Sequence, residues 1–231
     1  MKLTPILLAA ICLAGCNVTP AGPLQHESRS VPKDSFTSLN ANLSMGSGTL
    51  KISGGSHDLL NADFDYNVAE WKPDLQYSAS GDHGSLTLKQ PESRGSHSHT
   101  TNVWDLRLNN DIATNLNIQF GAGEAKMDLG ALALRSLDIQ MGAGEMKLDL
   151  RGTPAHDYDV HIQGGAGEAT VYVPKNAGIY AKAVGAIGEV KVHGLRQDGD
   201  HWVSEQYGQA GTPQIRLDIA GGVGQLNLSA E

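Results

Sequence analysis

One short phrase, written four times between residues 121 and 192, constrains this chain more than any other feature. Three copies read Gly-Ala-Gly-Glu and end at Glu124, Glu145 and Glu168, and a fourth, Gly-Ala-Ile-Gly-Glu, ends at Glu189. The glycines that precede these glutamates are spaced by 21, 23 and 21 residues. A near-constant period of this length is typical of stacked structural units rather than of one globular core. We therefore expect a solenoid.

The residues around each phrase alternate between apolar and polar. Leu116, Ile118 and Phe120 precede the first copy, and Ala125 and Met127 follow it, with polar residues between them. This is the period of a half-buried β-strand, and no stretch of the chain has helical spacing. Glycine inside a strand pattern marks a bend, because it reaches positive φ without steric cost. The pattern predicts an all-β fold in which each glycine phrase is a corner.

The period also sets the size of one unit. A coil of about 21 residues, at roughly 3.3 Å per residue, has a perimeter of about 70 Å, enough for two or three short strands. Such coils bury apolar surface only when stacked, with backbone hydrogen bonds between neighbours. Looser copies of the phrase occur around Gly48 and Gly84. We expect a single β-solenoid domain over residues 34–229, with a capping part at 34–110 that holds extra strands such as 61–71, and a repeat part at 111–229.

The first fifteen residues read as a bacterial export signal. Lys2 precedes an apolar run from Ile6 to Leu13, which is too short to span a bilayer stably. The sequence Leu13-Ala14-Gly15-Cys16 resembles the lipobox of bacterial lipoproteins. This resemblance implies that Cys16 becomes the first mature residue and carries the acyl chains that anchor the protein in a membrane. The alternative is an ordinary cleaved signal with an incidental cysteine.

Three further expectations follow from the N-terminal region. Asn17 follows Cys16 where an aspartate would suggest retention in the inner membrane, so a cell-envelope location at the outer membrane is favoured. Residues 16–33, with three prolines, read as a flexible tether. Cys12 and Cys16 are the two cysteines, and both lie in this region, so no disulfide is expected in the fold.

Charge excludes some partners. The net charge of −8 argues against nucleic acid and against anionic membrane surfaces, and nothing in the sequence indicates a cofactor. His97 and His99 stand two apart in a polar stretch, but a closed metal site needs three or four ligands, and no third is evident. We expect no metal site there.

If the corners stack, Glu124, Glu145, Glu168 and Glu189 form one column with neighbours about 4.8 Å apart. Carboxylates at that distance repel by about 0.9 kcal/mol in water, so something must offset the charge. Lys126, Lys147 and Lys191 lie two residues further on and could pair with the glutamates across coils, while Thr170 breaks the series. The alternatives are a calcium ion held by the glutamates and a strip that binds a partner.

Residues 195–213 interrupt the repeat. They contain Asp198-Gly199-Asp200, a hairpin turn signal, followed by Trp202 and Tyr207. A projecting hairpin with two aromatic rings would be a partner-binding element. The alternative is that these rings fold back and cover the last coil.

The ordered combination of Met45–Ile52, Gly54-Gly55, Leu59–Phe64 and the repeated Gly-Ala-Gly-Glu phrases resembles the bacterial toast-rack family. That family includes the C-terminal region of proteins that respond to cell-wall-active antibiotics, and proteins labelled as adhesins. The resemblance covers roughly residues 36–229 and implies a β-solenoid-like stack without assigned catalytic residues.

Three functions remain open at this point. The leading hypothesis is a non-enzymatic envelope lipoprotein, whose surface binds a protein or a glycan in an adhesin-like or scaffolding role. The second is a modulator of envelope-stress signalling, and the third is a secreted β-helix enzyme that acts on polysaccharide. The sequence leaves the oligomeric state undetermined. An enzyme would need acids or bases clustered in a groove, and such a cluster is not visible along the sequence.

Overall fold

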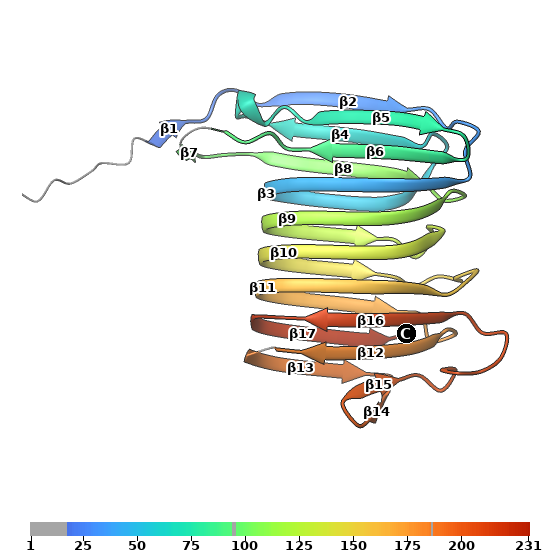
Figure 1. Cartoon of the computed structure of the whole chain (residues 1–231). Helices are drawn as coiled ribbons and strands as arrows, with labels where there is room; N and C mark the ends of the chain where they lie inside the picture. The colour runs from blue at the N-terminus through green and yellow to red at the C-terminus, as the bar shows by residue number, and fades with distance from the viewer. Residues whose placement is uncertain (1–17, 94–95, 186) are drawn as a thin grey trace, which may run out of the picture.

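The computed structural model, which describes residues 18–93, 96–185 and 187–231, is a stack of bent strands (Figure 1). Four long strands each cross a whole coil: β3 (Ser38–Ser56), β9 (Ala113–Asp128), β10 (Leu134–Asp149) and β11 (Tyr158–Val173). Each has a first arm before its glycine bend and a second arm after it, and neighbouring strands pair in parallel along both arms. The predicted all-β stack of coils with glycine corners is confirmed.

The bends stack in register because each one is made of glycine. Gly123 pairs with Gly48 on one side and with Gly144 on the other. Gly123 and Gly144 have φ values of 128° and 124°, which side chains rarely adopt. A Cβ atom on Gly144 would lie 2.0 Å from the carbonyl oxygen of Gly123. Glycine is therefore required here both for the backbone conformation and for the close approach of successive bends.

The core lies between the two arms of each coil. Leu116 and Ile118 on the first arm of β9 face Met127 on its second arm, and all three are at most 3% exposed. The same positions in the next coil are held by Leu137, Ile139 and Leu148. Apolar side chains thus form continuous columns through the stack, which no single coil could bury alone.

The C-terminal coils do not follow sequence order. The coil made of β16 (Gln214–Ala220) and β17 (Val223–Ala230) lies between β11 and the coil made of β12 (Gly178–Val184) and β13 (Ile187–His193). Gly224 pairs with Gly167 on one side and Gly188 on the other. The expectation that the fourth phrase stacks directly on the third is wrong. The phrase around Gly224 carries the same strand pattern and takes that place.

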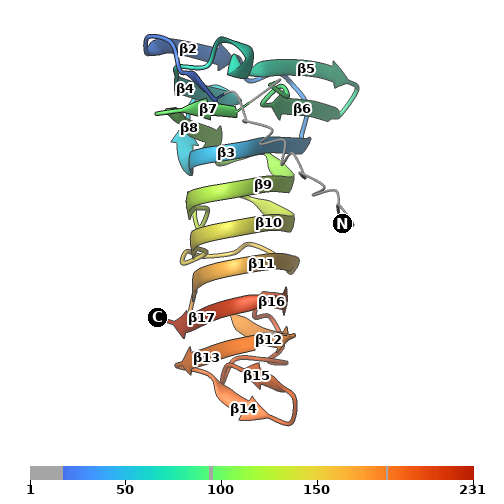
Figure 2. The same ribbon diagram turned by 90° about the vertical axis from the view of Figure 1, so that its left-hand side faces the viewer.

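A hairpin lies across the C-terminal end of the stack (Figure 2). It consists of β14 (Arg196–Asp198) and β15 (His201–Val203), and β15 pairs antiparallel with β12. Trp202 is half-buried and stands opposite Ala181, a core position, while Val203 is 3% exposed. The hairpin therefore continues the sheet beyond the first arm of the last coil, with β15 partly buried and β14 exposed.

The N-terminal end is closed by shorter strands. β6 (His83–Lys89) pairs in parallel with the first arm of β3, and β8 (Asn102–Asn109) pairs in parallel with its second arm. Three antiparallel strands lie outside these two. β5 (Asp74–Ser80) pairs with β6, β4 (Leu60–Tyr66) pairs with β8, and β2 (Gln25–Val31) pairs with β4. A 3-10 turn at Ala69–Trp71 and a small sheet of β1 (Val18–Pro20) and β7 (Ser96–Ser98) complete this end.

Side-chain amides complete the bend of β3, where the covering layer divides into β6 and β8. Gln90 Oε1 accepts hydrogen bonds from the backbone N–H groups of Gly46 and Ser47 at 2.9 and 3.3 Å. Asn102 Nδ2 donates to the carbonyl of Ser47 at 2.9 Å. These bonds replace those that another coil would make, so the backbone groups of the bend keep partners.

Two N-terminal expectations are wrong. Residues 25–31, assigned to a flexible tether, form β2, because Glu27, Arg29 and Val31 alternate with residues that face β4's acidic side chains. The glycine phrase around Gly84 is not a coil corner, since β5 and β6 form an antiparallel hairpin that turns at Gly81.

The export signal and Cys16 lie outside the described residues, so their assignment stays a prediction. Within the part of the chain that is described, no helix is long and apolar enough to cross a bilayer.

We predict that Gly144→Ala lowers the free energy of unfolding by about 3 kcal/mol, because the new Cβ is strained and meets the Gly123 carbonyl. Gly164→Ala is the matched control, since its Cβ would meet no atom within 4 Å, and it should change stability by less than about 0.5 kcal/mol. Urea denaturation measures both. Equal effects would contradict the role assigned to the bend.

Candidate binding surfaces

The second arms form one flat outer face, which carries the predicted glutamate column. Glu124, Glu145 and Glu168 stack in register as expected. Gln225 then stands between Glu168 and Glu189, because the C-terminal coil is inserted there. The predicted column of four glutamates is therefore corrected to three adjacent glutamates, a neutral glutamine and a separate glutamate.

The charges on this second-arm face are offset mainly within each coil, not across coils as expected. Lys126 pairs with Glu124 at 2.6 Å, and Lys191 pairs with Glu189 at 2.9 Å. Glu168 accepts a hydrogen bond from Asn227 of the inserted coil at 3.1 Å. These exposed pairs each contribute little to stability, but together they leave a ladder of alternating charge.

Calcium binding by this column finds no support in the geometry. Among the described residues, no group of three or more histidine, cysteine, aspartate or glutamate side chains is placed to hold a metal ion. His97 and His99 belong to no such group. A solvated charge ladder therefore stays the prediction for the glutamate column.

The first arms form the opposite face, whose outward side chains are uncharged on β3 and β9, while Asp138, Asp159, His161 and Asp218 bring charge to the later coils. Side-chain hydrogen bonds run between coils there, from Asn115 to Asn40 at 2.9 Å and from Asn117 to Asn42 at 3.2 Å. We call this surface the amide face, made of Asn40, Asn42, Ser44, Asn115, Asn117, Gln119, Ser136, Gln140 and Gln163. All nine are exposed or half-buried.

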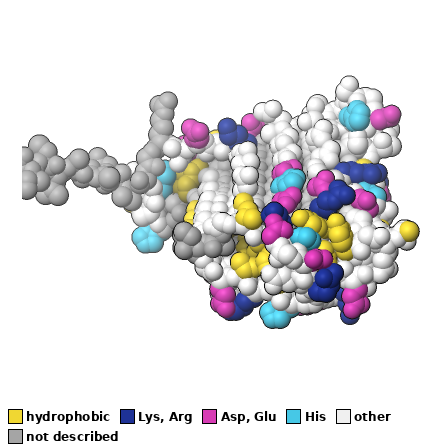
Figure 3. Space-filling view, turned by 60° about the horizontal axis from the view of Figure 1, so that its bottom comes forward, with side chains coloured by type: hydrophobic (Ala, Val, Ile, Leu, Met, Phe, Trp, Pro, Cys, Tyr) yellow, Lys and Arg dark blue, Asp and Glu magenta, His cyan; other side chains and the backbone are white. Residues whose placement is uncertain are grey.

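An aromatic cluster lies at the C-terminal end of the first-arm face. The ring of Tyr180 stacks on His201 at 4.6 Å between centroids and contacts Tyr207 at 5.7 Å. Asp200 bridges Lys182 and His201, and these two neighbours lower the pKa of its carboxyl group to about 2. Figure 3, which brings this end forward, shows hydrophobic side chains among acidic, basic and histidine side chains. Tyr207 remains 41% exposed.

A groove of about 550 Å³ opens beside Tyr207. Its other walls include His156, Arg216 and the loop around Gln209. In the first-arm register, Arg216 stands between Asp159 and Tyr180. The groove therefore lies in line with the column of Asn115 and Ser136, from which Asp159 separates it, and its volume falls in the range of small-ligand sites. Of the two aromatic residues that the sequence singled out, Tyr207 borders this groove and Trp202 does not.

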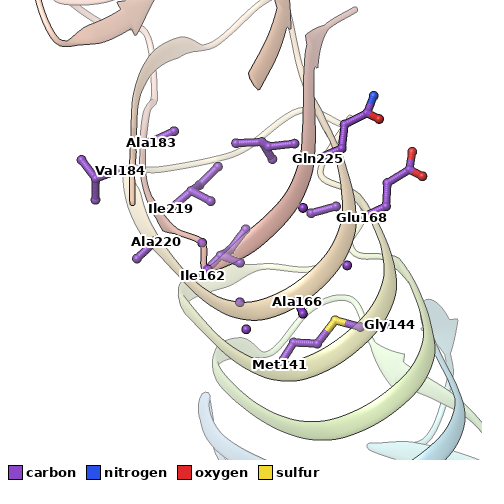
Figure 4. A pocket seen from close by; sticks show the side chains of 18 residues that line it. Met141, Gly144, Ile162, Ala166, Glu168, Ala183, Val184, Ile219, Ala220 and Gln225 are labelled. Carbon is purple, nitrogen blue, oxygen red and sulfur yellow. The ribbon is translucent and has the colours of Figure 1, made fainter. Parts of the chain in front are cut away.

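A small apolar cavity lies inside the bends of the last coils (Figure 4). The inward position held by Phe120 and Met141 becomes Gly164 in the next coil, and Ile162, Ala183 and Ile219 line the space that results. Its volume is about 70 Å³. A cavity of about 150 Å³ is known to hold benzene, so this one is a packing gap rather than a ligand site.

The structure also joins residues that sequence reasoning missed. On the N-terminal cap, His26 Nδ1 lies 2.7 Å from Asp65, and Ser28 Oγ lies 3.3 Å from His26 Nε2. The partners resemble a serine–histidine–aspartate set, but Ser28 donates its proton to Asp63 at 2.5 Å and His26 is 63% exposed. Hydrogen bonding to Asp65 raises the pKa of His26, which favours imidazolium over a general base. The alternation of residues 60–66 indicates that Asp63 and Asp65 share one outward face, but residues 25–31 carry no apolar alternation that would pair His26 with them.

Comparison with known proteins agrees with the fold. The family model described as the N-terminal domain of toast_rack matches residues 20–172, and that of the cell wall-active antibiotics response LiaF C-terminal region matches residues 131–228. A crystal structure of a putative cell adhesion protein from Clostridium sporogenes is 33% identical, with a TM-score of 0.86, over 90% of this chain and 100% of that one.

More distant matches include a putative adhesin from Bacteroides fragilis, 12% identical with a TM-score of 0.30, over 92% of this chain and 100% of that one. No curated protein matches the chain.

The chain is a β-solenoid with stacked glycine bends and two polar outer faces. The chain belongs to the toast-rack family.

We predict that Gln225→Glu lowers the free energy of unfolding by on the order of 1 kcal/mol at low salt, and by less at high salt. The new carboxylate would stand between those of Glu168 and Glu189 and be repelled by both. The matched control is Gln119→Glu, whose column neighbours Ser44 and Gln140 are uncharged. Chemical denaturation at two salt concentrations measures both. Selective rescue of Gln225→Glu by calcium would instead favour a cation site.

We predict that His26→Gln reduces the pH dependence of stability. The pKa of His26 is raised above 6.5 in the fold, so its contribution is complete below that value and is lost as pH rises through the folded-state pKa. Hydrogen exchange of β2 in the wild type should therefore accelerate from about pH 6 to about pH 8 beyond the intrinsic trend. If the variant shows the same acceleration, the assignment is wrong.

Proposed function

We propose that this protein is a non-enzymatic lipoprotein of the cell envelope whose solenoid presents a rigid surface for adhesion or scaffolding. The observation that carries the proposal is the register of the stack, which holds the outward side chains of successive coils in exposed columns. Pre-organised surfaces bind with a smaller loss of conformational freedom than flexible ones do. The 33% identical relative, described as a putative cell adhesion protein, supports the same role.

The proposed partner of this surface is an envelope protein or a glycan. The groove beside Tyr207 and the two flat faces are the available sites, and the glutamates at 124, 145, 168 and 189 border the second-arm face. The test is binding of the purified full chain, immobilised in detergent, to intact cells and to isolated envelope material. Binding that is saturable and competed by free protein is the expected result. Binding no stronger than that of a surface-charge-matched control protein would contradict the proposal.

A second candidate function is modulation of envelope-stress signalling. The match of residues 131–228 to the C-terminal region of a cell wall-active antibiotics response family favours it. Deleting the gene and measuring a cell-wall stress reporter with and without antibiotic would separate this role from adhesion. An altered reporter response with unchanged cell binding would favour signalling.

We further propose that Cys16 is lipidated and anchors the protein at the outer membrane. The sequence Leu13-Ala14-Gly15-Cys16 after an apolar run supports this proposal. Cys16→Ser should release the protein from membranes into the soluble fraction, because several acyl chains supply the anchoring. Cell fractionation and metabolic labelling with an acyl-chain analogue measure the effect. A variant that stays membrane-bound without detergent would contradict the anchor.

A further inference from the structure

Resting on the proposed adhesive function, we propose that the amide face and the groove beside Tyr207 form one binding site for a neutral oligosaccharide. A sugar chain presents hydroxyl groups that both donate and accept hydrogen bonds, together with apolar C–H faces. A site for it therefore needs paired donors and acceptors beside a flat ring. The first-arm face supplies amides at one end and Tyr207 at the other, with carboxylates and cations on the coils between them.

The amides are held in position with hydrogen-bonding capacity to spare. Asn115 Nδ2 donates to Asn40, and Asn115 Oδ1 accepts from Ser136 Oγ at 3.1 Å. A side-chain amide has two N–H groups and two acceptor lone pairs, so these ladder bonds leave one donor and one lone pair free on Asn115. Asn117 Nδ2 donates to Asn42 in the same way at 3.2 Å, and its neighbour in the next coil is Asp138. The two asparagine pairs therefore offer amide donors and acceptors at the spacing of the coils.

Tyr207 supplies the flat ring at the end of this surface. It is 41% exposed, and the ring of Tyr180 supports it from one side. Two hydrogen bonds from backbone N–H groups to side-chain oxygens fix the loop that carries it. Gly208 N donates to Gln214 Oε1 at 3.1 Å, and Gln214 N donates to Asp157 Oδ1 at 2.8 Å. A ring held this way can stack on a sugar with little loss of conformational entropy.

The charges beside the groove indicate a neutral rather than an anionic chain. Arg216 lies 3.7 Å from Asp159, and Lys182 lies 2.6 Å from Asp200. Each cation is thus accompanied by a carboxylate, and Asp138 and Asp218 add further negative charge to the same face, so an anionic sugar would be repelled. Such donor and acceptor pairs suit the adjacent hydroxyls of a neutral sugar. An extended peptide is less suited, since the strands of this face are already paired on both sides within the repeat.

The experiment titrates the full chain in detergent with two neutral tetrasaccharides, chitotetraose and cellotetraose, and with tetragalacturonate as an anionic probe. We expect saturable binding of at least one neutral probe and none of the anionic one. Tyr207→Ala should weaken binding about tenfold, whereas Tyr207→Phe, which keeps the ring, should stay within about threefold. Gln140→Ala tests the amide face, and Glu145→Gln on the second-arm face is the matched control.

Each other outcome overturns a distinct claim. If the protein binds cells but none of the neutral probes, the oligosaccharide inference fails and the adhesive function stands. If a neutral probe binds but only Glu145→Gln weakens it, the site is assigned to the wrong face. If tetragalacturonate binds more tightly, the ligand class is wrong. If neither cells nor sugars bind, both the inference and the proposed function fail.

Discussion

The structure depends on one close contact, between the carbonyl oxygen of a bend glycine and the α-carbon of the glycine in the next coil. A Cβ atom at Gly123, Gly144, Gly167 or Gly224 would lie between 1.8 and 2.0 Å from that oxygen. Removing the side chain lets whole coils approach to the spacing at which both arms form parallel ladders. Without this contact the arms could pair only as separate sheets, and the apolar columns between them would lose their register.

Because the register is fixed, residues at the same position of successive coils lie one above another in a column on the surface. The second arms repeat glutamate and lysine, which pair within two of the coils. The first arms of β3 and β9 carry asparagines that bond between coils, and carboxylates appear on the first arms of the later coils. The two faces therefore have different chemistry although they belong to the same strands. A toast-rack chain can change one face without changing the other.

The repeat in the sequence was sufficient to predict the class of fold, the bends and the inward residues such as Leu116 and Ile118, because each depends on local alternation and on glycine. Spatial order was not predictable in the same way. By sequence, either the phrase at Gly188 or the phrase at Gly224 could stack on the third phrase. The pairing of β17 with β11, between residues distant in the sequence, decides for Gly224. β2 was missed because it is polar on both faces, and apolar alternation cannot identify such a strand.

The candidate binding features depend even more on contacts between residues that are far apart in the sequence. Tyr207 could be named from the sequence as an exposed ring, but its groove arises only when Arg216, His156 and Gln209 meet from separate segments. The same holds for His26 and Asp65, which are 39 residues apart. Sequence alone also left open whether Trp202 projects or covers the last coil. Its place opposite Ala181 follows from the pairing of β15 with β12.

The inserted coil has a consequence for the order of events in the cell. β12 and β13 pair with the rest of the stack through β16 and β17, which are synthesised after them. Until residues 214–230 have been translated, the repeat ends at an open edge on β11, and the segment from β12 to β15 has no coil to dock on. The stack is therefore completed only when the last two strands have been synthesised. A chain that ends before β16 would keep this open edge, which can pair with other chains.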